Sequence, residues 1–174
     1  LFAAGGILGF WLAAKRIGDG SDANRIAGFG AMVGTLGFAA VLLAAPLSSA
    51  GLFAGGIALI GFGAGLFGHG TLTSCMQAAP TDKVGLALGS WGAVQATAAG
   101  LAIASGGLLR DTLAELATHG LLGEVLTGPA VGYCAVYVVE IALLFATLVV
   151  IGPLVRVPSR FDSPLGISEP QTAT

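Results

Sequence analysis

The chain has 174 residues, of which 55% are hydrophobic and 9% are charged, and its formal net charge is −2. Soluble domains carry about 25% charged residues, so this composition excludes an ordinary soluble protein and predicts an all-α, polytopic transmembrane helix bundle. The small negative charge and the isolated basic residues do not indicate a surface that binds nucleic acid.

Five apolar stretches follow one another along the chain, and a helix needs about 20 apolar residues to cross a hydrocarbon core of about 30 Å. The first stretch begins without Met and without a basic region, so it resembles the back half of a spanning helix, and we expect the chain to be a fragment. Pro46 and Pro80 end the second and third stretches, because the residue before a proline is driven out of the α conformation. The predicted spans are 1–14, 26–45, 50–79, 84–109 and 129–155.

Glycine is abundant in these spans, and pairs such as Gly85 and Gly89 are spaced by four residues. Because helices in lipid associate by close backbone approach at small residues, such pairs predict close helix contacts in a tight bundle. Five glycines between 61 and 70 favour a kink in the long third span. Between the fourth and fifth spans, the apolar spacing of 109–117 predicts a short separate interfacial helix, and His119 beside it is expected to be solvated.

Basic residues are unevenly distributed between the two ends of the spans. One end has only Arg110, whereas the other end has Lys15, Arg16, Arg25, Lys83, Arg156 and Arg160. Lys and Arg accumulate in cytoplasmic loops, so the tail at 156–174 is expected to be cytoplasmic, and its prolines predict disorder. Cys75 and Cys134 fall near opposite ends of their spans, too far apart for a disulfide, and are expected to be buried apolar residues.

One histidine lies within a long run that has no Asp, Glu, Lys or Arg. His69, Thr73 and Gln77 are spaced by four residues, so they share one face of the third helix and extend the ridge of Gly61 and Gly65. Such a strip can pack against another helix or line a cavity. His69 therefore either hydrogen-bonds a neighbouring helix or contacts a ligand, which includes axial ligation of a metal through neutral imidazole.

Two other spans contain polar residues that need partners. Gln95 follows Trp91 by one turn on the same face of the fourth helix, where it forms either an interhelical hydrogen bond or a ligand contact. Glu140 lies midway along the last span, where it should be protonated, paired or directed at a polar cavity, for proton coupling or for a structural hydrogen bond. Motifs of hydrolytic, redox or nucleotide chemistry are absent from the sequence, so we expect no enzyme and no catalytic residue.

Three strings of residues resemble a known family: ALIGFGAGLFGHGTLTSCM at 58–76, GLALGSWGAVQATAAGLAIASGGLLRD at 85–111, and GPAVGYCAVYVVEIALLFATLVVIGPLVR at 128–156. They closely resemble the PucC/LhaA bacteriochlorophyll delivery family, a branch of the major facilitator superfamily in phototrophic bacteria. The string GFWLAAKRIGDGSDANR at 9–25 is similar to the facilitator loop between the second and third helices of a half. The resemblance implies a major-facilitator-like C-terminal half, with the five spans as helices eight to twelve of twelve.

The resemblance also implies a function. It suggests an assembly factor for light-harvesting antenna complexes in the bacterial inner, intracytoplasmic photosynthetic membrane, which delivers bacteriochlorophyll to antenna polypeptides. The implied partners are the LH1 or LH2 polypeptides, the reaction-centre core and membrane lipid.

The magnesium of bacteriochlorophyll accepts one axial nitrogen or oxygen, so His69 is the candidate axial ligand on this resemblance. Trp91, Gln95 and Thr73 are further candidates for cofactor contacts. One alternative is a proton-coupled small-solute transporter that uses Glu140, and another is a structural subunit of a photosynthetic complex.

Overall fold

The computed structural model describes residues 1–123, 126 and 130–156. Over this part of the chain every regular element is helical, which confirms the all-α class. The elements are α1 (Phe2–Gly18), α2 (Ala23–Ala44), α3 (Ala50–Ala78), a 3₁₀ turn at Thr81–Lys83, α4 (Val84–Thr118) and α5 (Ala130–Arg156). By length and composition, α2, α3, α4 with its preceding turn, and α5 can each cross a membrane. Helix α1 has 17 residues.

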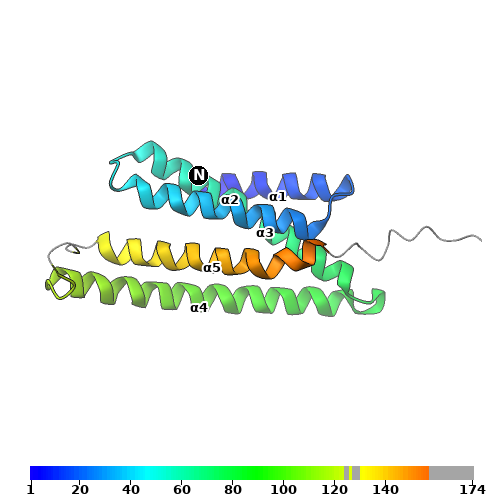
Figure 1. Cartoon of the computed structure of the whole chain (residues 1–174). Helices are drawn as coiled ribbons and strands as arrows, with labels where there is room; N and C mark the ends of the chain where they lie inside the picture. Colours follow the sequence, from blue (N-terminus) through cyan, green and yellow to red (C-terminus); the bar gives the residue numbers. More distant parts are fainter. Residues whose placement is uncertain (124–125, 127–129, 157–174) are drawn as a thin grey trace, which may run out of the picture.

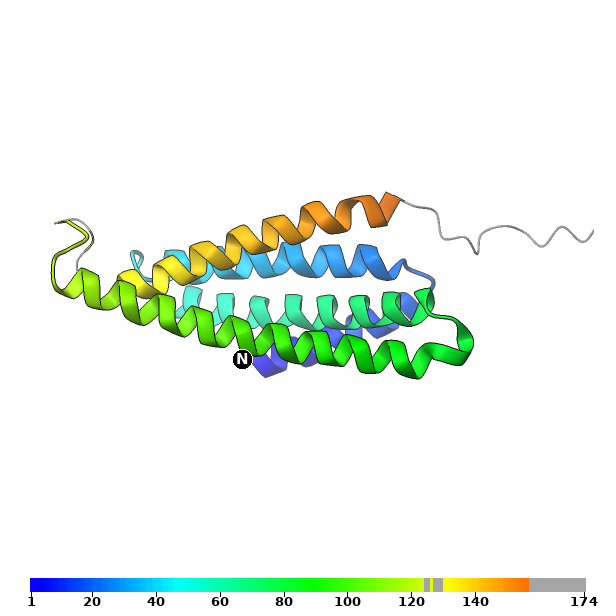
Figure 2. The ribbon, with the colours of Figure 1, turned by 90° about the horizontal axis from the view of Figure 1, so that it is seen from below.

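The helices run side by side and alternate in direction (Figure 1). Helix α3 packs extensively against both α1 and α2, and α5 lies between α2 and α4. Figure 2 shows that α4 and α5 are close where α4 ends and separate toward their other ends. The turns at 19–22 and 79–83 lie at one end of the bundle, and the turn at 45–49 lies at the other (Figure 1).

Local chemistry explains where the helices begin and end. The side chain of Asp22 accepts a hydrogen bond from the backbone N–H of Arg25 at 2.8 Å, and that of Ser49 caps α3 in the same way. Each cap satisfies a backbone donor that the first turn leaves free. Helices α2 and α3 end just before Pro46 and Pro80, as the sequence predicts. Gly20, with φ +93°, permits the turn from α1 into α2.

The core consists mostly of small residues at helix seams. A Cβ added to Gly63 would lie 2.6 Å from the carbonyl oxygen of Gly30, and one added to Gly30 would lie 2.7 Å from that of Gly63. The backbones of α2 and α3 therefore meet directly, as expected for helices that associate in lipid. The buried apolar residues are Ala13, Ala23, Ala27, Ala31, Val33, Val41, Ala44, Leu66 and Ala117.

Two expectations about the helices are wrong in this structure. Gly85 and Gly89 have no atom within 4 Å of an added Cβ, so this pair makes no close helix contact, and the same holds for Gly51 and Gly55. The predicted interfacial helix is instead the last part of α4, which continues without a break to Thr118. The physical reason is that residues 108–118 contain neither Gly nor Pro, so nothing interrupts the helix.

The two cysteines bear out one expectation and contradict another. Cys75 and Cys134 are both free, as predicted, but both are partly exposed and not buried, because each lies at the edge of a helix contact. Helix α3 is continuous over 29 residues, and several of its glycines lie against neighbouring backbones. Pro129 and the tail beyond Arg156, for which disorder was predicted, lie outside the described residues.

Candidate functional site

His69 lies in the seam between α1 and α3. Its ring meets the ring of Phe10 edge to face, with centroids 4.4 Å apart and planes at 66°. One turn earlier, Gly65 lies against the backbone of Gly6, and one turn before that Gly61 lies against Phe2. The ridge of Gly61, Gly65 and His69 therefore packs against another helix, which is the first of the two arrangements that the sequence allows.

One ring nitrogen of His69 lies within this seam. Nδ1 is buried and has no hydrogen-bond partner among the described residues, and its neighbour across the seam is the ring of Phe10. A histidine that ligates a metal usually donates its other N–H to an oxygen, which fixes the ring. The imidazole fits attachment of a magnesium-bearing macrocycle at one point, but the seam gives Nδ1 no described acceptor that would hold the ring in place.

The other members of the polar strip are not directed at a shared site. The hydroxyl of Thr73 donates to the carbonyl of His69 at 2.9 Å, so its proton is used within α3. Gln77 is exposed at the end of the same face. Within the part of the chain that the structure describes, three or more His, Cys, Asp and Glu side chains nowhere form a cage for a metal ion.

Trp91 contacts α3 from a different side. Its indole N–H donates to the hydroxyl of Thr71 at 3.4 Å. Thr71 follows His69 by two residues, which is about 200° around a helix, so Trp91 and His69 lie on different sides of α3. Gln95, one turn beyond Trp91, is exposed and forms no side-chain hydrogen bond with a described residue.

Glu140 lies on α5 between two residues that face α2. Tyr137 approaches Phe38 with ring centroids 6.1 Å apart, and Leu144 comes within 3.8 Å of the position of a Cβ on Gly34. A residue four before Leu144 is about 40° from it around the helix, so Glu140 is on the inner side of α5. Its carboxyl group is half-buried and makes neither a hydrogen bond nor an ion pair with the residues that are described.

The structure adds polar contacts that the sequence did not predict. The hydroxyl of Ser74 donates to the side-chain oxygen of Asn24 at 2.8 Å and joins α3 to α2. The thiol of Cys75 lies 3.6 Å from the carbonyl oxygen of Ala87 on α4. Over residues 69–75, α3 therefore contacts α1, α2 and α4. In the sequence, the short polar side chains of these segments were the available signal for such contacts.

A hollow of about 580 Å³ lies along one face of α1 and is lined by Ala3, Gly6, Ile7, Phe10, Trp11 and Ala14. Two further cavities are lined by residues of more than one helix. The smaller, of about 240 Å³, is lined by Gly30, Ala31, Gly34, Phe38, Ile60, Gly63, Ala64, Phe67, Leu144 and Thr147. The larger, of about 460 Å³, is lined by the adjoining ends of α2, α3 and α5. His69, Thr73, Trp91, Gln95 and Glu140 line neither of them.

Sequence reasoning missed the aromatic residues of the larger cavity. Phe53, Tyr133 and Tyr137 line it, and the two tyrosines are one helical turn apart near the start of α5. Tyrosines near the end of an apolar span are typical of a membrane interface, and this was the available signal.

Comparisons with known proteins place the chain in a family. The family model described as PUCC protein matches residues 1–158. The chain belongs to the PucC family. Protein PucC of Cereibacter sphaeroides is 50% identical over 155 residues, which are 89% of this chain and 33% of that protein.

Two relatives from Rhodobacter capsulatus are also similar. An uncharacterized protein in the puhA-bchM intergenic region is 48% identical over 160 residues, or 92% of this chain and 33% of that protein. Protein PucC of the same organism is 41% identical over 158 residues, or 90% of this chain and 33% of that protein. The chain thus spans about a third of the length of these relatives. Solved structures give no match.

Proposed function

We propose that this PucC family chain takes part in the assembly of light-harvesting antenna complexes and that it helps to deliver bacteriochlorophyll to antenna polypeptides. The observation that carries the proposal is the family match over residues 1–158, which includes all five helices. A bundle of apolar helices suits a hydrophobic pigment and needs no catalytic group to hand it over. The proposed partners are the LH1 or LH2 polypeptides and the reaction-centre core, in the intracytoplasmic photosynthetic membrane.

His69 is the residue that we propose as the axial ligand of the bacteriochlorophyll magnesium. Support comes from its imidazole within an apolar helix and from its buried Nδ1, which has no hydrogen-bond partner among the described residues. Bound bacteriochlorophyll would supply the light-absorbing macrocycle, and the chain would supply only attachment and exclusion of water. Trp91 and Gln95 lie on α4 and Thr73 has its hydroxyl bonded within α3, so we propose them only as contacts to the periphery of a pigment.

A deletion strain tests the proposed function. Near-infrared absorption of its membranes should show reduced antenna bands, and expression of the full-length protein should restore them. The purified protein should carry bacteriochlorophyll and should co-purify substoichiometrically with immature antenna. Normal antenna bands in the deletion strain would contradict an assembly role. A fixed stoichiometry on finished complexes would indicate a structural subunit instead.

A proton-coupled transporter is the second candidate, and Glu140 is the observation that favours it. A half-buried carboxyl group without a described partner, midway along an apolar helix, is a typical position for a proton carrier. Proteoliposomes with an imposed pH gradient should then take up a small solute, and Glu140→Gln should abolish the uptake. Under the assembly proposal, Glu140→Gln should leave antenna formation largely intact.

A further inference from the structure

The larger cavity opens where the turn at 45–49 joins α2 to α3. Its wall is formed mostly by apolar side chains of three helices, together with two tyrosines on α5 and the serines Ser48 and Ser49 of the turn. The volume of about 460 Å³ falls within the range of about 300–1,000 Å³ that is usual for small-molecule sites. The full lining is Val41, Leu42, Ala44, Ala45, Ser48, Ser49, Ala50, Phe53, Ala130, Tyr133, Cys134 and Tyr137.

A cation lies beside this apolar wall. The guanidinium of Arg110 is 5.4 Å from the centre of the Tyr133 ring, and the backbone of Arg110 packs against Gly132. Every other Lys or Arg of the described helices and turns lies toward the opposite end of the bundle: Lys15, Arg16, Arg25, Lys83 and Arg156. Arg110 is therefore the positive charge that a ligand of this cavity would meet.

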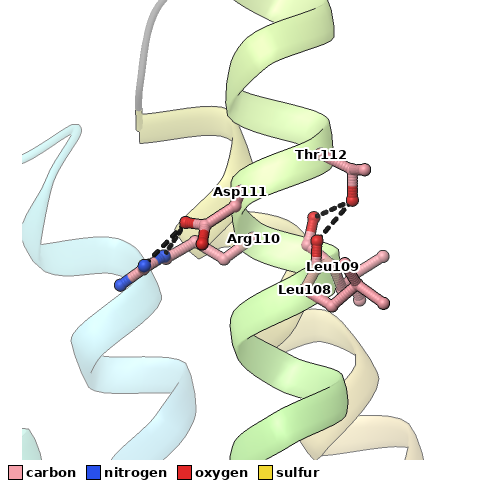
Figure 3. A network of polar contacts seen from close by, with 5 residues as sticks. All are labelled: Leu108, Leu109, Arg110, Asp111 and Thr112. Atoms are coloured by element: carbon pink, nitrogen blue, oxygen red, sulfur yellow. Dashed lines mark hydrogen bonds and ion pairs between the residues drawn. The ribbon is translucent and has the colours of Figure 1, made fainter.

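The ion pair of Arg110 leaves it able to bind a second anion. Figure 3 shows its Nε and Nη2 directed at a single carboxylate oxygen of the adjacent Asp111, at 2.8 and 2.6 Å. The side chains of Arg110 and Asp111 are 40% and 67% exposed, so water or a ligand can reach the pair. A guanidinium has five N–H donors, and this contact uses two of them.

We propose that this cavity binds one hydrocarbon chain of an anionic phospholipid, whose phosphate lies at Arg110. The apolar wall excludes a polar ligand, because a polar group placed there would lose its hydrogen bonds to water. An arginine at the rim favours a lipid head group whose phosphate is not accompanied by a positive charge. Guanidinium and phosphate form strong charge-assisted hydrogen bonds. Tyr133 and Tyr137 present apolar rings with a polar tip, which suits the boundary between acyl chains and head groups.

Native mass spectrometry of the purified protein in mild detergent tests this site. The protein is titrated with phosphatidylglycerol and, separately, with phosphatidylethanolamine that carries the same acyl chains. One tightly bound phosphatidylglycerol is expected, with a preference over phosphatidylethanolamine of about fivefold, the factor expected for one basic residue near an anionic head group. Arg110→Gln should remove the preference, whereas Asp111→Asn should increase it.

Matched variants separate the cavity from general lipid adhesion. Lys15→Gln is the control, because Lys15 lies 5.5 Å over the Trp11 ring in a similar cation–aromatic pair away from the cavity. It should leave the preference unchanged. Cys134→Phe, or Ala50→Leu if the first variant does not fold, fills the cavity and should reduce binding of both lipids. Equal binding of the two lipids, or a preference that survives Arg110→Gln, would overturn the proposal.

Discussion

At the scale of single residues, glycine decides how close two helices come. Gly63 and Gly30 face each other across the seam of α2 and α3, where an added Cβ would lie within 2.7 Å of a carbonyl oxygen. Gly55, two turns earlier on α3, has open space around it. Two glycines of the same helix therefore have different roles, and one of them is required for packing.

Gly63→Ala should destabilise the protein by about 1–3 kcal/mol, because the new methyl group forces the two backbones apart. Gly55→Ala should be neutral or stabilise by up to about 1 kcal/mol, since alanine restricts the unfolded chain more than glycine does. Unfolding of each variant in detergent, by heat or by dodecyl sulfate, measures the two changes in stability. Equal changes in stability for the two substitutions would show that the seam between α2 and α3 accommodates the methyl group without loss of stability.

His69→Leu tests the axial-ligand proposal at the same scale. Leucine keeps a similar volume and the contact with Phe10 but removes both nitrogens, so pigment per purified protein should fall while membrane accumulation stays near normal. His119→Leu is the matched control, because His119 is exposed at the end of α4. If His69 is only a packing residue, stability should change little, because its buried Nδ1 has no described hydrogen bond to lose, and pigment content should be unchanged.

At the scale of helices, α4 is held at its two ends by different neighbours. Near its start, the indole of Trp91 and the backbone of Ala87 meet α3 through Thr71 and Cys75. Near its other end, the backbone of Arg110 meets α5 at Gly132. Between these attachments most of the described α4 surface is exposed, and Ala117 is the one buried residue of the helix.

Trp91→Phe should therefore weaken the attachment of α4 to α3. Phenylalanine keeps an aromatic ring but cannot donate to Thr71, so the expected loss is about 0.6 kcal/mol. Limited proteolysis near Thr81–Lys83 and hydrogen exchange of 84–95 should both become faster. Trp11→Phe serves as the control, because Trp11 is exposed and lies on α1. If both variants behave alike, the Thr71 contact contributes nothing measurable.

The helices could be predicted from the sequence, whereas most of their contacts could not. Proline and capping residues are local signals, so the ends of α2 and α3 fell within a few residues of their predicted positions. The glycine pair at 85 and 89 has the same spacing as the pair at 61 and 65, but only the latter meets another helix. Spacing specifies a face of a helix, and the fold determines which neighbour meets that face.

The candidate site, too, could be predicted from the sequence only in part. The sequence predicted that His69 shares a ridge with Gly61 and Gly65, and the structure places this ridge against α1. The separation of His69 from Trp91 depends on which helices flank α3, and a single sequence does not contain that information. The apolar spacing of 109–117 suggested a separate interfacial helix, but most of the residues there are good helix formers, and the segment extends α4.

At the scale of the whole molecule, the bundle has two chemically different ends. One end combines the turns at 19–22 and 79–83 with the last turn of α5 and carries most of the basic residues. The other combines the turn at 45–49 with the end of α4, where the basic residue is Arg110. If basic ends face the cytoplasm, this arrangement fixes the side on which each turn is exposed.

Cysteine labelling in intact cells and in inverted vesicles checks this orientation. In a background of Cys75→Ala and Cys134→Ala, Ser21→Cys and Thr81→Cys should react with a membrane-impermeant maleimide only in inverted vesicles. Ser48→Cys should react only when the outer side is accessible, because it lies in an exposed turn at the other end of the bundle. Reversed labelling of all three would invert the orientation but preserve the bundle. Labelling of Ser21→Cys and Ser48→Cys from the same side would contradict the bundle itself, since α2 would then not cross the membrane between them.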